Sequence, residues 1–219
     1  MALSQVELRR RLWHQICYLD FRSAQEPTVA DNDFTTLLPR NVNDEDLVEG
    51  AHPLETPSPG FADMTGHLIR LHGVHCFWRI VRSTYWLERR IKSSSFHGDG
   101  DLVAEFQSLF VEFRITVDEM AANFQTQFLQ YCDPDIPGHR LALGLATVIE
   151  WHCWSIVWLR TPKQYRETVV SPDIRQTVFA KSVSLVESMT QIPNDKDAQK
   201  FSWYIGGYAC FQAIMHIVT

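Results

Sequence analysis

One segment of the sequence constrains the fold class more than any other. Over residues 102–128, apolar side chains recur at spacings of three or four residues. They are Leu102, Phe106, Leu109, Phe113, Val117, Met120, Phe124 and Phe128. Because an α-helix has about 3.6 residues per turn, this spacing predicts a long helix with one apolar face. Such a face must pack against other elements, so we expect Leu109 and Phe113, in its middle, to be buried.

Five further helices are predicted by the same periodicity and by helix start and stop signals. We expect them at residues 5–24, from a cap at Asp63 or Thr65 to about residue 92, at residues 140–160, from Ser171 and Pro172 onward, and from about residue 197. Segment 140–160 is apolar nearly all round, which predicts a central helix covered on several sides. No stretch alternates like a strand, so we predict a single all-α domain over residues 1–219 with about six helices.

The first of these helices carries an apolar stripe of its own. Its members, Leu8, Leu12, Ile16 and Leu19, follow one another at spacings of four, four and three residues, with charged residues off the stripe. A stripe of this kind is typical of a helix that packs on a core. We expect the face that carries Arg9 to Arg11 to be solvated, with one arginine turned inward.

Residues 25–60 are predicted to form a long loop within the domain. They contain five prolines and several acidic residues. Proline interrupts helices and sheets, so we expect no regular element there. Loops of this length are uncommon in compact domains and tend to be functional or bound to a partner.

The last predicted helix ends in an apolar stripe that runs to Thr219 without a glycine or a polar cap. We expect the end of this stripe, formed by Tyr208, Phe211, Ile214 and Ile217, to be partly uncovered. Exposed apolar patches usually mark interfaces. The four residues are therefore a candidate surface for self-association or for a protein partner.

Charge and cysteine content exclude several classes of function. The chain has 20 Lys and Arg against 26 Asp and Glu, and this acidic balance repels a phosphate backbone, so we expect no autonomous DNA binding. Five scattered cysteines include no C-x2-C pair, which excludes a zinc cluster and favours reduced thiols in an intracellular protein. We find no signal peptide and no apolar run of the roughly 20 residues that a membrane span needs, and we expect a nuclear or cytosolic protein.

Candidate metal and catalytic residues are weakly supported. His72 and His75 are three residues apart, and Glu150, His152 and Cys153 offer further ligands. However, Glu150 and His152 point about 200° apart on one helix, and no H-E-x-x-H or G-x-S-x-G pattern occurs. We predict no catalytic, cofactor or metal site, and hence no enzyme. The seven tryptophans are interpreted as core, with a Trp-lined cavity of a ligand-binding protein or small enzyme as the alternative.

Three ordered motifs in the first 70 residues resemble the fungal-specific transcription factor domain, the middle homology region of fungal zinc binuclear cluster transcription factors. The first is Arg9, Arg10, Arg11, Leu12 and Trp13, continued by Asp20 and Arg22. The second is Asp33 and Phe34, continued by Pro39, Asn43, Asp44 and Asp46. The third spans residues 61–70, with Asp63, Met64 and Thr65 at its centre.

This resemblance implies a regulatory role in transcription, covering only the later part of such a factor and lacking its six-cysteine cluster. It implies an effector-responsive or partner-binding helical module that controls a fungal metabolic or secondary-metabolite gene cluster. Such a module is expected to reach DNA only through a full-length or partner protein. The effector is not identified by these motifs. Independently of the resemblance, we expect Arg11 or Arg22 to pair with Asp20, Asp44 or Asp46 and so hold the acidic loop on the first helix.

Overall fold

The chain folds as a bundle of α-helices, as the sequence predicts. A computed structural model describes residues 3–23, 29, 34–47, 60–92, 99–161, 166–191, 196, 213–215 and 217–218. The elements, in chain order, are α1 (Leu3–Ser23), the 3-10 helix η2 (Asp44–Leu47), α2 (Thr65–Lys92), α3 (Asp99–Gln127), the 3-10 helix η3 (Leu129–Tyr131), α4 (Pro137–Arg160), α5 (Arg166–Val169) and α6 (Pro172–Gln191). The described residues contain no strand.

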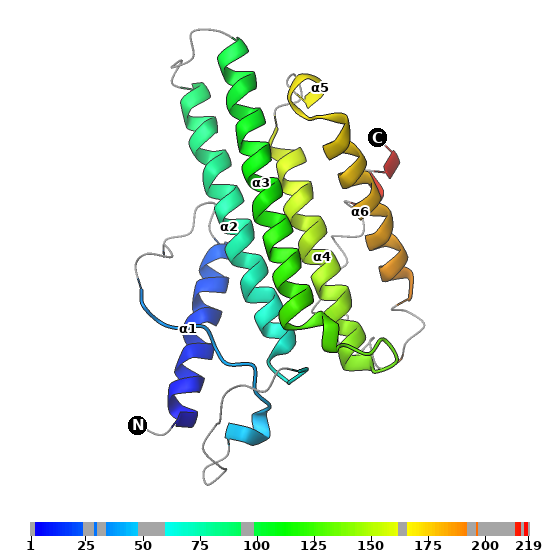
Figure 1. Ribbon diagram of the computed structural model, residues 1–219. Helices are drawn as coiled ribbons and strands as arrows, with labels where there is room; N and C mark the ends of the chain where they lie inside the picture. The colour runs from blue at the N-terminus through cyan, green and yellow to red at the C-terminus, as the bar shows by residue number, and fades with distance from the viewer. Residues whose placement is uncertain are drawn as a thin grey trace.

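Four long helices, α2, α3, α4 and α6, run side by side, and α1 lies at the edge against one end of α2 (Figure 1). Helix α4 contacts α2, α3 and α6, which confirms the central position predicted from its apolar surface. Its Trp151 and Trp154 are buried in the core. Trp86 is different, because 53% of it is exposed, so the interpretation of the tryptophans as core is wrong for that residue.

The apolar stripe of α3 faces the core as predicted. Phe113 is only 4% exposed and seven of the eight stripe residues are buried, whereas Leu109 is partly buried and packs at the margin of the same cluster. The opposite side of α3 carries exposed Val111 and Ile115. Helix type and inward face were therefore both readable from the 3.6-residue period.

A glycine allows α2 and α4 to approach closely. At Gly73, a Cβ atom would overlap the side chain of Ile149 on α4. The same helix pair brings two buried thiols together, with Cys153 Sγ donating to Cys76 Sγ at 3.8 Å. This contact lowers the pKa of Cys76, and together with burial it raises the pKa of Cys153. Both cysteines are free thiols.

Helix α6 begins as its sequence predicts, with Ser171 Oγ accepting the N–H of Ile174 at 3.4 Å and Pro172 in the first helical position. It is held against α4 by Trp151, whose Nε1 donates to Ser182 Oγ at 2.9 Å. The short helix α5 was not predicted. The last predicted helix lies mostly outside the described residues, although 213–215 and 217–218 are helical.

In the N-terminal part, the apolar stripe of α1 is exposed and the expected loop contains a short helix. Leu8, Leu12, Ile16 and Leu19 do not face the core, because each is between 47% and 62% exposed. The 25–60 segment is also not wholly irregular, since Asp44–Leu47 forms the helix η2. The reason for both lies in the polar contacts that the opposite face of α1 makes with this segment, described below.

We predict that Phe113→Ala lowers the free energy of unfolding by about 3 to 5 kcal/mol, because it removes a buried aromatic side chain and leaves a cavity. Urea unfolding followed by circular dichroism measures the loss. The matched control is Val111→Ala on the exposed side of α3, for which the change should stay within about 0.5 kcal/mol. Equal losses for the two variants would contradict the assigned inward face.

Candidate functional site

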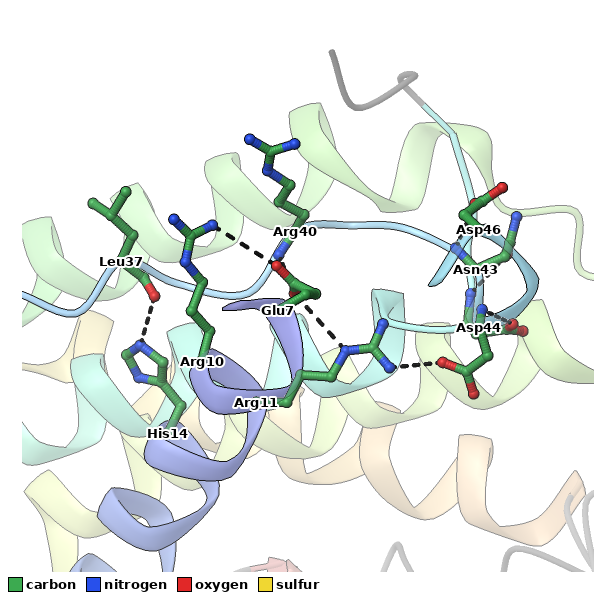
Figure 2. Close-up of polar contacts among 10 residues, drawn as sticks. Glu7, Arg10, Arg11, His14, Leu37, Arg40, Asn43, Asp44 and Asp46 are labelled. Carbon is green, nitrogen blue, oxygen red and sulfur yellow. Dashed lines mark hydrogen bonds and ion pairs between the residues drawn. The ribbon is translucent and has the colours of Figure 1, made fainter. Parts of the chain in front are cut away.

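The three motifs meet at one place, where α1, residues 34–47 and the start of α2 come together. We call this place the junction. Figure 2 shows its central contacts, which join side chains of α1 to the segment that runs past them. The site predicted from motif likeness is thus a set of structural contacts between neighbouring elements.

A buried carboxylate stands at the centre of the junction. Glu7, on α1, is 2% exposed and its Oε1 accepts the backbone N–H of Arg40 at 2.8 Å (Figure 2). Arg10 and Arg11 approach the same carboxylate, each at 3.8 Å. Burying a charge is costly unless it is paired and hydrogen-bonded. The two arginines therefore turn inward with Glu7, whereas Arg9 stays exposed.

Arg11 also makes one of the ion pairs that the sequence predicts. Its Nη1 lies 2.6 Å from Asp44 Oδ1. The Asp44 side chain is 73% exposed, and exposed pairs contribute only about 0 to 1 kcal/mol, so this pair positions the loop more than it stabilises the chain. The side chain of Arg22, the other predicted partner, lies outside the described residues.

Residues 34–40 are held in extended form along α1 by ring and carbonyl contacts. Trp13 packs edge-on against Phe34, with ring centroids 5.3 Å apart. His14, which is 1% exposed, donates from Nε2 to the carbonyl oxygen of Leu37 at 3.2 Å (Figure 2). The extended backbone thus obtains partners from α1 in place of a neighbouring strand.

The second and third motifs are tied to each other by hydrogen bonds that their side chains make with backbone groups and with one another. Asp63 Oδ2 accepts the N–H of Asp44 at 3.0 Å, and Asn43 Oδ1 accepts the N–H of Asp63 at 3.1 Å. Asn41 accepts from the Thr65 hydroxyl at 3.0 Å and donates to the carbonyl of Gly60 at 2.9 Å. These bonds fix the start of α2 beside η2.

Two remaining acidic motif residues have local roles. Asp46 Oδ2 accepts the N–H of Asn43 at 3.0 Å, which closes the turn of η2. Asp20 Oδ2 accepts the N–H of Val29 at 3.1 Å and so holds the chain where it leaves α1. Pro39 is buried, and Asp33 lies outside the described residues.

Arg70 contacts a glutamine of α1 and a histidine of its own helix where α1 and α2 meet. Arg70 Nη2 donates to Gln15 Oε1 at 2.7 Å and lies 2.7 Å from His67 Nδ1. Burial, followed by the charges of Arg70, Arg11 and His14, lowers the pKa of His67 from 6.5 to about 4. The imidazole is therefore neutral near pH 7, and its Nδ1 accepts the hydrogen bond from Arg70.

The sequence reasoning missed Glu7 and gave no contact to His14 or Arg70, although a signal for Glu7 and His14 was present. Glu7, Arg11 and His14 follow at spacings of four and three residues, so they form a polar stripe on the side of α1 opposite the leucines. A polar stripe of this kind is ordinarily taken for a solvent face. Nothing within α1 alone shows that residues 34–47 return to cover it.

The candidate metal ligands are separated and engaged elsewhere. His72 lies beside Phe128, which follows α3, with ring centroids 6.0 Å apart, whereas His75 lies 6.3 Å from His14 of α1. Glu150 pairs with Lys181 at 2.6 Å. Within the described residues, no group of three or more His, Cys, Asp or Glu side chains could hold a metal ion.

A shallow groove of about 520 Å³ runs beside the junction, between α1 and residues 35–37. Its polar lining comes from Arg9, Arg10, Thr35 and Thr36, and Trp13 forms its aromatic wall. A separate apolar area lies at the end of the chain, where Ala213 is buried against Trp151 and Leu185 but Ile214 is 44% exposed.

Of the four residues predicted to form an interface at that end, Tyr208 and Phe211 lie outside the described residues and Ile217 is partly buried. An interface there stays a prediction. The described part of the chain has no helix with the length and apolar character needed to cross a membrane.

Comparison with known proteins gives two matches. The chain is 74% identical over 227 aligned positions to the C6 finger domain transcription factor hasF of Aspergillus fumigatus, with all of this chain but 30% of that protein covered. The chain is homologous to one part of a C6 zinc-cluster transcription factor. It is also 22% identical to the aurofusarin cluster transcription factor aurR2 of Gibberella zeae, over 98% of this chain and 31% of that protein.

The chain therefore spans about a third of the length of the curated relatives it matches. No protein-family model matches it, and no solved structure matches it significantly. The likeness to C6 factors indicated by the motifs is confirmed by the alignment of the whole chain with one part of hasF.

We predict that Glu7→Gln weakens the attachment of residues 34–40 to α1. Hydrogen bonds to a charged group contribute about 1.5 to 3 kcal/mol, so protection of the Arg40 amide against hydrogen exchange should fall by roughly 10-fold to 100-fold. Asp44→Asn is the matched control, because it removes a charge from an exposed pair and should change that protection by less than about 5-fold. A larger effect from Asp44→Asn than from Glu7→Gln would contradict the central position of Glu7.

We also predict that stability falls as the pH drops from 6.5 toward 4, in part through His67. The folded chain holds this imidazole neutral down to a pKa of about 4, whereas the unfolded chain protonates it near 6.5. Protons therefore favour the unfolded state in that window, and the contribution is fully present above pH 6.5. Urea unfolding at several pH values should show a shallower dependence for His67→Asn, which keeps an acceptor near Nδ1 but does not titrate. An unchanged pH dependence would contradict the lowered pKa.

Proposed function

We propose that this chain acts as a regulatory helical module of a fungal zinc-cluster transcription regulator, and that it works through protein contacts without a DNA-binding cluster of its own. The observation that carries the proposal is the 74% identity to hasF along the whole chain. Similarity at that level, with several of the motif residues joined by polar contacts at the junction, supports a module of the same kind as the matching part of that factor.

The chemistry of the junction supports regulation more than catalysis. Glu7, Asn41, Asp63 and Thr65 use their polar atoms on backbone groups or on one another. Such contacts hold elements together and leave no nucleophile and base pair within the junction. We infer that the chain is not an enzyme.

Contact with DNA is proposed to be indirect. The net charge of −6 and the absence of any C-x2-C pair from the sequence oppose direct binding to duplex DNA. For this role we propose a nuclear location, with the cytoplasm as the alternative. Because aurR2 is named for the aurofusarin cluster, we propose a secondary-metabolite gene cluster as the kind of target.

A small-molecule effector is a second candidate, favoured by the groove beside the junction. Its arginines and Trp13 suit a planar acidic compound, since guanidinium groups bind carboxylates and stack on aromatic rings. The alternative of a Trp-lined cavity has weaker support, because Trp151 and Trp154 are packed in the core.

Exchange of the homologous segment tests the regulatory role. The matching part of hasF is replaced by this chain, and transcription from a hasF-dependent promoter is measured in the fungus. We expect transcription at the level of the unmodified factor, and a loss of regulation when the inserted chain carries Glu7→Gln. Asp44→Asn is the matched control. An inactive chimera that is still nuclear, abundant and bound to its promoter would contradict the proposal.

The isolated chain is then titrated against promoter DNA at about 150 mM salt, where non-specific phosphate contacts are screened. We expect no sequence-dependent complex. A specific complex that survives this salt concentration would contradict indirect contact with DNA.

A further inference from the structure

Two buried thiols meet between the packed faces of α2 and α4. Cys76, on α2, is 5% exposed, and Cys153, on α4, is fully buried. Their Sγ atoms are 3.8 Å apart, and the thiol of Cys153 donates to the sulfur of Cys76. The thiol of Cys76 donates in turn to the carbonyl oxygen of Thr116 on α3, at 3.9 Å. The two sulfur atoms are therefore held facing each other by hydrogen bonds.

The packing of α2 on α4 brings these sulfur atoms together. The two helices run in the same direction (Figure 1), and Gly73 of α2 leaves room for the side chain of Ile149 of α4. Cys76 follows Gly73 by three residues and Cys153 follows Ile149 by four, so both thiols lie about one helical turn beyond this close approach. A disulfide is about 2.05 Å long, so the sulfur atoms need to approach by about 1.8 Å, shared between two side chains.

The two thiols differ in acidity. The hydrogen bond from Cys153 lowers the pKa of Cys76, burial opposes this change, and the charge of Arg79 adds to the lowering. The same hydrogen bond raises the pKa of Cys153, and burial and the charges of Cys76 and Glu150 raise it further. The thiolate is the nucleophilic form of a cysteine. Cys76 is therefore the sulfur that attacks an oxidant, and Cys153 is the thiol that responds to it.

We propose that Cys76 and Cys153 form a modification site, at which hydrogen peroxide converts the thiol pair into a disulfide that links α2 to α4. In the first step the sulfur of Cys76 attacks one peroxide oxygen, the O–O bond breaks, and a sulfenic acid and water are formed. In the second step the sulfur of Cys153 attacks the sulfur of Cys76, the S–O bond breaks, and the thiol proton leaves with the hydroxyl group as water. The two thiols lose two electrons and two protons, and one peroxide is reduced to two molecules of water.

Burial makes this site slow to react but selective in its product. Oxidation of a thiol depends on its thiolate character and on its access to solvent. Cys132 is less buried, but burial raises its pKa and its thiol donates to the carbonyl oxygen of Phe128 at 3.6 Å. At Cys76 a second sulfur lies 3.8 Å away and reacts with the sulfenic acid before another peroxide molecule enters. We therefore expect the disulfide to form with little accumulation of sulfenic acid.

The disulfide fixes the spacing of α2 and α4 at the centre of the bundle, where α4 also contacts α3 and α6. It links residues that are 77 positions apart, and a cross-link that closes a long loop strongly restricts the unfolded chain. We therefore expect the oxidised chain to melt about 5 to 15 °C above the reduced chain. The inference rests on the contact between the two thiols and does not depend on the proposed role in transcription.

Peptide mapping by mass spectrometry tests the pairing in the whole chain. The reduced protein is treated with hydrogen peroxide under native conditions, the remaining thiols are alkylated, and the disulfide-linked peptides are identified. We expect the Cys76–Cys153 link to be the main disulfide, to raise the melting temperature and to be reversed by dithiothreitol. A main disulfide between other cysteines, or oxidation of Cys132 while Cys76 and Cys153 stay reduced, would overturn the proposal.

The unfolded chain is the matched control for selectivity. In concentrated urea, chain length determines which cysteines meet, and Cys132 and Cys153 are 21 residues apart, against 77 for Cys76 and Cys153. The shorter loop should then close about 7-fold more often. We expect the folded chain to reverse this order. An excess of the Cys132–Cys153 link under native conditions as well would show that oxidation proceeds through the unfolded chain, and would overturn the proposal.

Single variants test the two roles. In Cys153→Ala no second thiol closes the bond, so peroxide should leave Cys76 as a sulfenic acid that dimedone labels. In Cys76→Ala, residue Cys153 should stay unlabelled at the same peroxide exposure. Cys132→Ala is the control and should form the same disulfide as the wild type, and circular dichroism checks that each variant is folded. Labelling of Cys153 but not of Cys76 would overturn the assigned order of attack, and the mapping of the wild-type chain tests the pairing without any substitution.

Discussion

The buried carboxylate of Glu7 determines how the N-terminal third of the chain is built. A carboxylate that is 2% exposed needs compensating donors and charges. The donors come from the Arg40 backbone and from two arginines of α1 itself. Once this face of α1 is turned inward, residues 34–47 have to cross it, and the apolar face has to turn outward.

This constraint explains which parts of the structure could be predicted from the sequence. The α3 stripe and the position of α4 were predictable because apolar periodicity and apolar surface report directly on packing. The outward face of α1 was not, because a leucine stripe with polar residues opposite ordinarily predicts the reverse orientation. Its true orientation depends on Arg40 and Leu37, which are more than 20 residues away in sequence and become neighbours only in the fold.

The junction was predictable as a set of residues but not as a set of contacts. The motif resemblance identified Arg11, Asp44 and Asp63. The opposite charges of Arg11 and Asp44 predicted the ion pair that these two residues form. The bonds of Asn41, Asn43 and Thr65 to Gly60, Asp63 and Ala62 depend on backbone groups of a loop whose path no periodicity describes. Such side-chain to backbone bonds replace secondary structure where the chain is extended, which is why the motif residues are mostly short and polar.

At Gly73, the residue that would best stabilise α2 as an isolated helix differs from the residue that allows α2 to pack closely against α4. Glycine in the middle of a helix is less favourable than alanine by roughly 0.5 to 1 kcal/mol, so this position weakens α2 as an isolated helix. In the folded chain the same position admits the Ile149 side chain where a Cβ atom would stand. A methyl group at residue 73 would therefore make a peptide of α2 more helical while forcing the two helices of the intact chain apart. Gly73 therefore lowers the helix propensity of α2 but allows close packing between α2 and α4.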